Sequence, residues 1–354
     1  VHLFREQDTR DELGQGTIRD AFSDHFFPGT STVQTRVRYM LFVPWMYRRL
    51  EERRIPTSTV AKKARDAETG LIPELLKTEN EVGVIGSEAG KGLKRLPSSI
   101  YWSGLGAWGI RLFEGSQEEY HRSLDAFYRH ESSSSLYSGE ADEELHSNGR
   151  RPNWHPGLPK RPSGFPWDVT LSLTRGEAAY LRDRFLTLHG DTLLAALLRK
   201  KKLYRAEFPW ELPIVPELPE RLQQDLTQAQ NFSEVMHGAS LCYNLILSRM
   251  RGSKAWICKY EHRLAQWSGR ISAVRGDLRA WRRDMDEFWK SPALEKVHVS
   301  RPTQLFVETW AAYAIDKPGP GKVADHQPVE DLLREREVAL KHGRARLENP
   351  RALE

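Results

Sequence analysis

Apolar residues recur every three or four positions between residues 257 and 288, and this is the clearest pattern in the chain. Ten positions follow it without a break: Ile257, Tyr260, Leu264, Trp267, Ile271, Val274, Leu278, Trp281, Met285 and Phe288. We call these ten residues the heptad seam, because alternating steps of three and four place them along one side of a helix. At 1.5 Å per residue, the seam predicts one long helix of roughly 45–50 Å.

The heptad seam needs an apolar surface to pack against. It is expected to pack on its own domain, with the C-terminal helix predicted at 328–347 as its natural partner. The alternative is a coiled coil with a second copy of the chain or with a protein partner. Gly269 and Gly276 favour packing within the domain, because glycine weakens a helix that stands alone.

Three- and four-residue periods predict further helices through most of the chain. They cover residues 1–13, 17–27, 32–54, 57–77, 98–113, 117–130, 174–188, 193–202, 223–249 and 328–347. Capping boxes, in which two side chains bind backbone N–H groups at a helix start, are expected at Ser31–Gln34 and Thr174–Glu177. Alternation predicts a short strand at 169–173, whereas 82–85 fits a short strand or a loop. The predicted fold class is therefore mainly α, with at most a minor strand element.

The composition changes sharply between residues 131 and 168. This stretch holds four consecutive serines, several glycines and five prolines, which is typical of linkers and long loops. We therefore predict an N-terminal helical domain over residues 1–130 and a C-terminal helical domain over residues 169–354. A linker or long loop at 131–168 joins them, and the C-terminal domain contains the long helix near 255–290.

The composition is that of a soluble folded protein. Of 354 residues, 39% are hydrophobic and 29% are charged, which excludes a wholly disordered chain. The longest apolar run, Met40–Tyr47, is shorter than a membrane span and contains Pro44. We predict a buried, kinked central helix there and no membrane partner. The only cysteines, Cys242 and Cys258, exclude a disulfide framework and favour a reducing compartment, so the expected location is cytoplasmic.

The chain is basic, with 53 Lys and Arg residues against 48 Asp and Glu residues and a net charge of +5. Arginine supplies 37 of these cations, and guanidinium groups suit phosphates and aromatic faces. The excess lies in residues 169–354, which hold 30 basic and 24 acidic residues. Genome composition also favours arginine, and an ordinary solvated surface is the alternative interpretation. Charge alone therefore allows nucleic-acid binding without requiring it.

Two basic runs carry the candidate nucleic-acid-binding residues. The denser run is followed by Tyr204, Phe208 and Trp210, and cations interleaved with aromatics suit single-stranded or distorted nucleic acid. The structural alternative is a helix C-terminus, whose dipole favours cations. The other run is a glycine-rich turn next to a helix start, where a backbone phosphate can bind. The candidates are Arg199, Lys200, Lys201, Lys202 and Arg205 in the first run, and Lys91, Lys94 and Arg95 in the second.

The glycine-rich turn at 86–92 imitates a nucleotide-binding loop without matching it. Such a loop needs four residues between its glycines and a hydroxyl residue after its lysine. Here three residues intervene, and Gly92 follows Lys91. Nucleotide hydrolysis is therefore not expected.

The other candidate metal and catalytic sites can each be explained as an ordinary structural feature. Glu118–His121 and Glu143–His146 share the spacing of di-iron bundles, but the second pair lies in the predicted linker. His237 is expected in a buried polar cluster. The charged segment Phe4–Glu12 suits magnesium, although helical pairs such as Glu6–Arg10 also explain it. Catalytic residues stay unknown, and we predict no metal and no cofactor.

Short segments spread over nearly the whole chain carry a family resemblance. They are Phe4–Gly14 (FREQDTRDELG), Phe27–Thr32 (FPGTST), Leu41–Trp45 (LFVPW), Arg95–Trp102 (RLPSSIYW), Met236–Ala239 (MHGA), Tyr243–Leu245 (YNL), Arg334–Glu337 (RERE) and Pro350–Glu354 (PRALE). Together they resemble an uncharacterised bacterial family, a domain of unknown function. The resemblance transfers no catalytic residue. It implies an occurrence in genomic islands beside helicases and other anti-phage genes.

Three functions remain open from the sequence. The leading one is a nucleic-acid-binding accessory protein, for DNA or RNA, without a catalytic site of its own. The second is a structural or interaction subunit whose heptad seam, Ile257–Phe288, holds a protein partner or a second copy. The third is a metal-dependent nuclease whose site is divided among distant segments.

Overall fold

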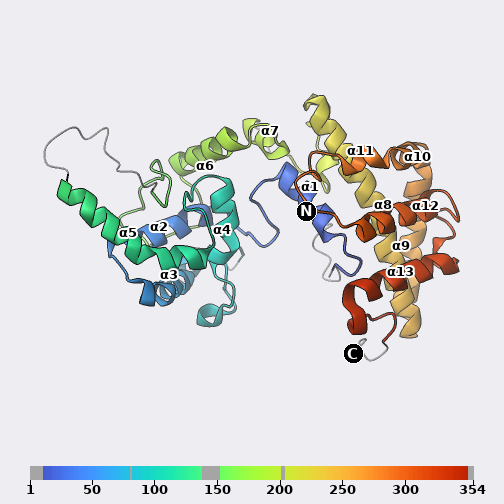
Figure 1. Ribbon diagram of the computed structural model, residues 1–354, viewed down its shortest axis with the longest axis horizontal. Coiled ribbons are helices and arrows are strands. Elements are labelled where there is room, and N and C mark those ends of the chain that lie inside the picture. The colour runs from blue at the N-terminus through green and yellow to red at the C-terminus, as the bar shows by residue number, and fades with distance from the viewer. Residues whose placement is uncertain (1–10, 80–81, 138–151, 201–203, 350–354) are drawn as a thin grey trace. The chain divides into compact units, whose positions relative to one another are not determined.

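The computed structural model describes residues 11–79, 82–137, 152–200 and 204–349. These residues form thirteen α-helices, several short 3₁₀ turns and no strand (Figure 1). The mainly α fold class is confirmed. A single isolated β-bridge joins Arg111 to Trp154.

The strand predicted at residues 169–173 is wrong. Its backbone bonds to side chains instead of to a neighbouring strand: the Val169 carbonyl accepts from Thr78 Oγ1 at 2.6 Å, and the Leu171 N–H donates to Glu79 at 2.6 Å. The alternating sequence reflects burial of Val169 and Leu171 in the core. Residues 82–85, which fitted a strand or a loop, form turns.

The chain divides into two compact units, one of residues 27–200 and one of residues 1–26 with 201–354. This division differs from the one expected from composition, which placed a linker at 131–168. Residues 138–151 lie outside the described residues, but Trp154, Leu158 and Phe165 are buried in the core of the first unit. A proline-rich composition indicates irregular backbone and does not show whether the aromatic residues within it are buried.

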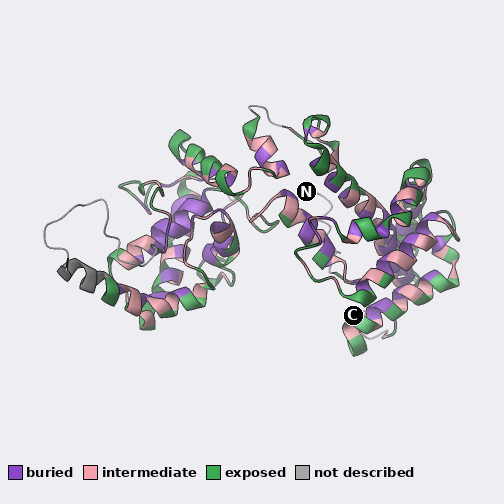
Figure 2. Cartoon of the chain, turned by 45° about the horizontal axis from the view of Figure 1, so that its top comes forward, coloured by how far each residue is buried: buried purple, intermediate pink, exposed green. Residues whose placement is uncertain are grey.

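The unit of residues 27–200 is built around one fully buried helix, α2. Every residue from Tyr39 to Tyr47 is buried, Pro44 included, which confirms the predicted buried helix (Figure 2). Helix α2 packs against α3 and α4, and α5 packs against both of those. The helices of this unit are α2 (Tyr39–Glu52), α3 (Thr57–Thr78), α4 (Pro97–Ala107), α5 (Gln117–Tyr137), α6 (Arg175–Leu188) and α7 (Leu193–Arg199).

One of the two predicted capping boxes forms. Thr174 caps α6 by accepting from the Glu177 N–H, and the Glu177 carboxylate accepts from the Thr174 N–H. Ser31–Gln34 caps nothing, because α2 begins only at Tyr39, and the Gln34 side chain donates to the Gly29 carbonyl instead. The short-range pattern thus predicts a cap correctly only where a helix follows at once.

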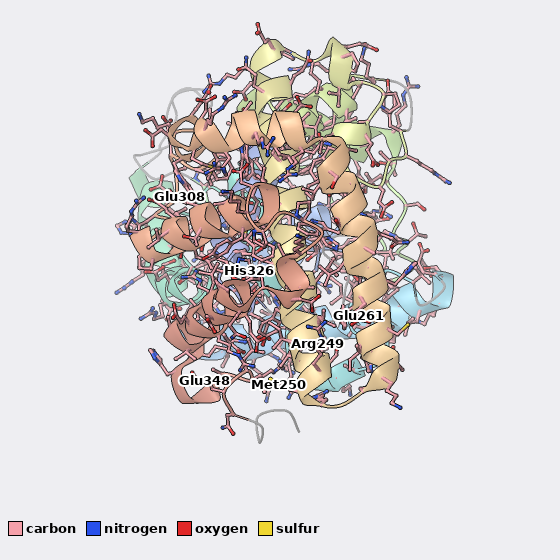
Figure 3. All side chains as sticks on the ribbon, turned by 90° about the vertical axis from the view of Figure 1, so that its right-hand side faces the viewer. Arg249, Met250, Glu261, Glu308, His326 and Glu348 are labelled. Carbon is pink, nitrogen blue, oxygen red and sulfur yellow. The ribbon has the colours of Figure 1, made fainter. Side chains whose placement is uncertain are left out.

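The other unit is organised around α8 (Glu220–Met250), the longest described helix. Helix α8 packs against α1, α9, α10, α12 and α13. Figure 3 shows Arg249 of α8 beside Glu261 of α9, which it contacts at 3.4 Å. The remaining helices are α1 (Gly16–Phe26), α9 (Lys254–Ala273), α10 (Arg275–Arg283), α11 (Met285–Trp289), α12 (Arg301–Ile315) and α13 (Gln327–Lys341).

The heptad seam does not form one rod. It runs through α9, α10 and α11, with breaks at Val274 and Asp284. The first break has a nonlocal cause: Arg275 donates to the Ile315 carbonyl at 2.6 Å and to the Asp316 carbonyl at 3.0 Å, which ties the start of α10 to the end of α12. Val274 is consequently 44% exposed.

Eight of the ten seam residues are buried inside this unit, as packing on its own domain predicts. Helix α9 packs along α8, whereas α13, the expected partner of the seam, packs on α8 and α12. Trp267 shows how close the main contact is, because its indole lies against Gly238 of α8 and its Nε1 donates to the Glu234 carbonyl at 2.8 Å.

Gly238→Ala is expected to destabilise the protein. A Cβ at Gly238 would lie 2.2 Å from the Trp267 ring. Because this ring is fully buried, it has no space into which it could move. Overpacking of this kind costs about 1–3 kcal/mol. Urea unfolding measures the loss. The matched control is Gly269→Ala, where a Cβ meets no atom within 4 Å; it should be neutral or stabilising by up to about 1 kcal/mol, and equal losses in both variants would contradict the packing.

A buried polar network crosses the core of the 27–200 unit. Glu68, fully buried on α3, accepts from the Ser98 N–H and from Ser98 Oγ, each at 2.7 Å. The Gln117 amide donates to Ser98 Oγ at 2.9 Å and to Tyr47 Oη at 2.6 Å. Burial raises the pKa of Glu68 to about 7, against the opposing effect of the Ser98 hydrogen bonds. The network therefore joins α2, α3, α4 and α5 through one carboxyl group that favours its neutral form.

Glu68 is expected to make the protein less stable as the pH rises from about 4.5 to 7. In this window the folded chain keeps a proton that the unfolded chain has released, so the free energy of unfolding falls with pH, by roughly 3 kcal/mol from this group alone. Glu68→Gln should flatten that slope in urea melts at pH 5 and 7.5. The exposed Glu118→Gln should leave the slope as it is in the wild type, and a slope unchanged by Glu68→Gln would contradict the assignment.

Candidate nucleic-acid interface

The predicted basic run at residues 199–205 is divided between the two units. Arg199 ends α7, and Arg199 and Lys200 are exposed at the end of the 27–200 unit. Lys201 and Lys202 lie outside the described residues. Arg205 is exposed but belongs to the other unit. Of the following aromatics, Phe208 and Trp210 stack on each other with ring centroids 5.2 Å apart, so each covers one face of the other.

The second predicted run lies on an exposed turn beside α3. Lys91, Lys94 and Arg95 are exposed. Arg65 of α3 holds the turn by donating to the Leu93 carbonyl at 2.7 Å and to the Lys91 carbonyl at 3.3 Å. The described residues directly before the turn, 82–85, form no strand, so they differ from the strand that precedes a nucleotide-binding loop. It presents three cations on a fixed backbone.

The arginines between the seam positions are largely engaged within their own unit. Arg270 contacts Glu234 at 3.4 Å, and both Arg279 and Arg282 pair with Asp316, at 2.9 and 2.7 Å. The charge excess of the C-terminal half therefore does not become an open basic stripe along α9 and α10.

A basic patch that the sequence analysis missed lies at the C-terminal end of α2. We call it the α2 patch, and it consists of Arg48, Arg49, Arg53, Lys160 and Arg161. The side chains of Arg48, Arg49 and Arg53 make no hydrogen bond or ion pair with another described residue. Arg161 pairs with Glu52 at 2.7 Å, which fixes the loop carrying Lys160 and Arg161 against α2.

Within the α2 patch, Arg49 lies close enough to Arg53 and Arg161 for their charges to act on it. Partial burial, and then the charges of Arg53 and Arg161, lower the pKa of Arg49. The hydrogen bond from Arg161 lowers the pKa of Glu52, and the charges of Arg48 and Arg49 add to this effect. The helix dipole favours cations at this end of α2. Glu52 is therefore a carboxylate on which three arginines of the patch act, Arg48, Arg49 and Arg161.

Helix α2 ends on an arginine in the conformation that glycine prefers. Arg54 has φ of 48°, and the Arg54 and Ile55 N–H groups donate back to the Glu51 and Leu50 carbonyls, which is a Schellman end. A left-handed non-glycine residue costs roughly 1–2 kcal/mol. A further cation thus occupies a position where glycine would stabilise the fold.

The sequence signal for the α2 patch was four arginines within the seven residues 48–54. It was hidden because Glu51 and Glu52 stand between them and balance the local charge. The structure removes Glu51 from that balance by turning it inward, where its carboxylate accepts from Asn153 Nδ2 at 2.9 Å and Trp154 Nε1 at 3.2 Å.

A second cluster of charges, in the other unit, serves to fasten the chain. The buried Glu337 accepts from Tyr243 Oη at 2.6 Å and from the Leu347 N–H at 2.9 Å. Glu12 pairs with Lys341 and, at 3.6 Å, with Arg346. A cavity of about 760 Å³ lies beside these groups. Its carboxylates are matched by cations, and they tie residue 12 to α8 and α13.

The described residues contain no group of three or more His, Cys, Asp or Glu side chains that could hold a metal ion. His121 stacks on Tyr47 at 5.8 Å, and Glu143 and His146 lie outside the described residues. Burial raises the pKa of Cys242 to about 12, so this cysteine is not an activated nucleophile. Among the helices described, none has the length and apolar character needed to cross a membrane.

The family model of DUF6361, a family of unknown function, matches residues 1–354. The chain belongs to DUF6361. The resemblance seen in the short segments is thereby confirmed as a family relationship. Neither the curated proteins nor the solved structures contain a match to this DUF6361 chain.

Arg54→Gly is expected to stabilise this DUF6361 protein by about 1 kcal/mol, because glycine adopts positive φ without the cost borne by arginine. The comparison is Arg53→Gly, one residue earlier, where φ is −86° and glycine brings no relief. Thermal and urea unfolding measure both variants. A stabilisation of Arg53→Gly equal to that of Arg54→Gly would indicate relief of charge repulsion in place of backbone strain.

Proposed function

We propose that this DUF6361 protein binds the phosphate backbone of nucleic acid through the α2 patch, as an accessory protein. The observation that carries the proposal is that the side chains of Arg48, Arg49 and Arg53 make no hydrogen bond or ion pair with another described residue, while burial and then the charge of Arg53 lower the pKa of Arg49. A protein keeps such repulsion at a cost to its stability, and a bound polyanion removes it. Guanidinium groups also match phosphate geometry with paired hydrogen bonds.

Neighbouring cations extend the α2 patch across α6. The charges of Arg184 and Arg48 both act on Tyr180, whose pKa burial raises to about 12. Arg184 itself donates to the Trp108 carbonyl at 3.3 Å and is thereby fixed in place. The exposed turn with Lys91, Lys94 and Arg95 supplies a second basic surface on the same unit. Several fixed cations on one unit suit a ligand with many phosphates better than a single small anion.

The other two functions suggested by the sequence receive less support. Most of the heptad seam is covered within its own unit, so little apolar surface of the seam remains for a protein partner. A metal-dependent nuclease would need carboxylates that can bind the metal. Those near the α2 patch, Glu51 and Glu52, are engaged by Asn153, Trp154 and Arg161.

Replacement of Arg48, Arg49 and Arg53 together by glutamine should weaken binding to a fluorescein-labelled 20-nucleotide dT strand and a 20-base-pair duplex. Wild-type binding is expected in the micromolar range at low salt and should weaken steeply with added salt. The triple variant should lose at least about tenfold in affinity for both ligands. The slope of log K against log salt should become shallower by about 2 to 3, because each phosphate contact contributes roughly 0.7 to 0.9.

The matched control removes the same charge from the other unit by replacing the exposed Arg221, Arg283 and Arg344 with glutamine. This control should keep most of the wild-type affinity and slope. Equal losses in the two triple variants would show that net charge, and not the α2 patch, drives binding. Absence of wild-type binding to either ligand at low salt would refute the proposed function.

A further inference from the structure

Trp167 is the most exposed tryptophan of the described chain, with 59% of its surface accessible. No contact between its ring and another described aromatic ring or cation is present. A side chain of this size and apolar character is normally a core anchor, as Trp45 and Trp154 are in the same unit. Its exposure therefore requires an explanation.

The backbone around Trp167 holds the ring outward. Phe165, two residues before, is buried with its ring 6.0 Å from Phe42 and 5.6 Å from Trp45. Val169, two residues after, is buried and bonded to Thr78. Asp168, between them, has φ of 53°, a left-handed conformation that costs a non-glycine residue roughly 1–3 kcal/mol. Two buried anchors and a strained turn fix a chain path in which Trp167 points to solvent.

The same loop carries part of the α2 patch. The Pro159 carbonyl accepts from Trp45 Nε1 at 2.7 Å, and Arg161 pairs with Glu52 at 2.7 Å. Arg161 and Trp167 are six positions apart, so their Cα atoms lie no more than about 22 Å apart even along an extended path. Lys160, Arg161 and Trp167 thus stand on one loop that is fastened to α2. Asp168 is the one carboxylate of this loop and is itself exposed.

We infer that Trp167 is a stacking platform for an unpaired base, and that the α2 patch therefore prefers single-stranded nucleic acid to duplex. This inference rests on the proposed function, because the cations hold the backbone whose base the ring receives. Cations and an open aromatic face on the same loop match a strand that offers phosphates and free base faces together. In a duplex the base faces are covered by their neighbours, and such a ring has nothing to stack on.

The other prominently exposed tryptophan provides a matched comparison. Trp256 of α9 is 46% exposed, but Lys259 Nζ lies 4.1 Å from its ring centroid and Tyr260 stacks on it at 5.9 Å. Its faces are therefore partly occupied from within the chain. It also belongs to the unit that lacks the α2 patch.

Fluorescence anisotropy of the full chain with the 20-nucleotide dT strand and the 20-base-pair duplex tests the inference. Trp167→Ala should weaken binding to dT by about 5- to 150-fold, since stacking of one base contributes roughly 1–3 kcal/mol. Binding to the duplex should change by less than about twofold. Trp167→Tyr should recover most of the affinity for dT, because tyrosine also offers an aromatic face. Trp256→Ala should bind both ligands as the wild type does.

The outcomes separate the inference from the proposed function. Unchanged binding of Trp167→Ala to dT overturns the inference and leaves salt-dependent binding by the α2 patch intact. Equal losses on dT and duplex also overturn it, because they place the ring on the backbone or report a damaged fold, which thermal unfolding of the variant distinguishes. Wild-type protein that binds neither ligand refutes the proposed function itself.

Discussion

Burial of α2 is the constraint on which the unit of residues 27–200 depends. A helix apolar around its whole circumference has to be covered on every side, and here α3, α4 and the irregular segment 152–170 provide the cover. This requirement explains why the proline-rich segment 152–170 packs as core: Pro159 and Phe165 contact Trp45 directly. The same requirement explains where on α2 charged residues can be placed. Only the C-terminal end of α2 reaches solvent, and its accessible residues are charged: Arg48, Arg49, Glu51 and Glu52.

The covering of α2 consequently produces the candidate site. The loop that shields the helix must cross its exposed end, and there Arg161 meets Glu52 while Lys160 and the α2 arginines gather beside it. The next anchor of the same loop, Phe165, sets the direction in which Trp167 leaves the surface. Fold and candidate site therefore share residues, which is why backbone strain at Arg54 and Asp168 occurs close to the site and not in a distant loop.

Local patterns in the sequence were sufficient wherever the deciding contacts are local. The Thr174–Glu177 capping box and helices such as those predicted at 57–77 and 223–249 depend on residues within a turn of one another, and the structure contains them as the capping box of α6 and as α3 and α8. The strand at 169–173 was predicted wrongly because Thr78 and Glu79, about ninety residues away, take its backbone hydrogen bonds. The prediction of a single rod at 257–288 was wrong because Arg275 donates hydrogen bonds to the Ile315 and Asp316 carbonyls, which tie the start of α10 to the end of α12.

The candidate site was harder to predict for the same physical reason. A count of charges treats Glu51 as a neutraliser of its arginine neighbours, and only the fold shows that Asn153 and Trp154 withdraw it into the interior. The chain also contains eleven tryptophans, and nothing in their spacing distinguishes Trp167 from those that anchor cores.

The discontinuity of the second unit has a consequence for synthesis of the chain. Helix α1 is made early, yet His25 pairs at 2.7 Å with Asp225, which lies 200 residues later. At 5–20 residues per second, the ribosome delivers that partner about 10–40 s afterwards. During this delay Phe22 and Phe26 of α1 are without the surface that buries them in the finished protein, while the 27–200 unit already has its complete sequence. Until α8 emerges, the nascent chain therefore carries α1 with its apolar face uncovered and in need of protection from premature association.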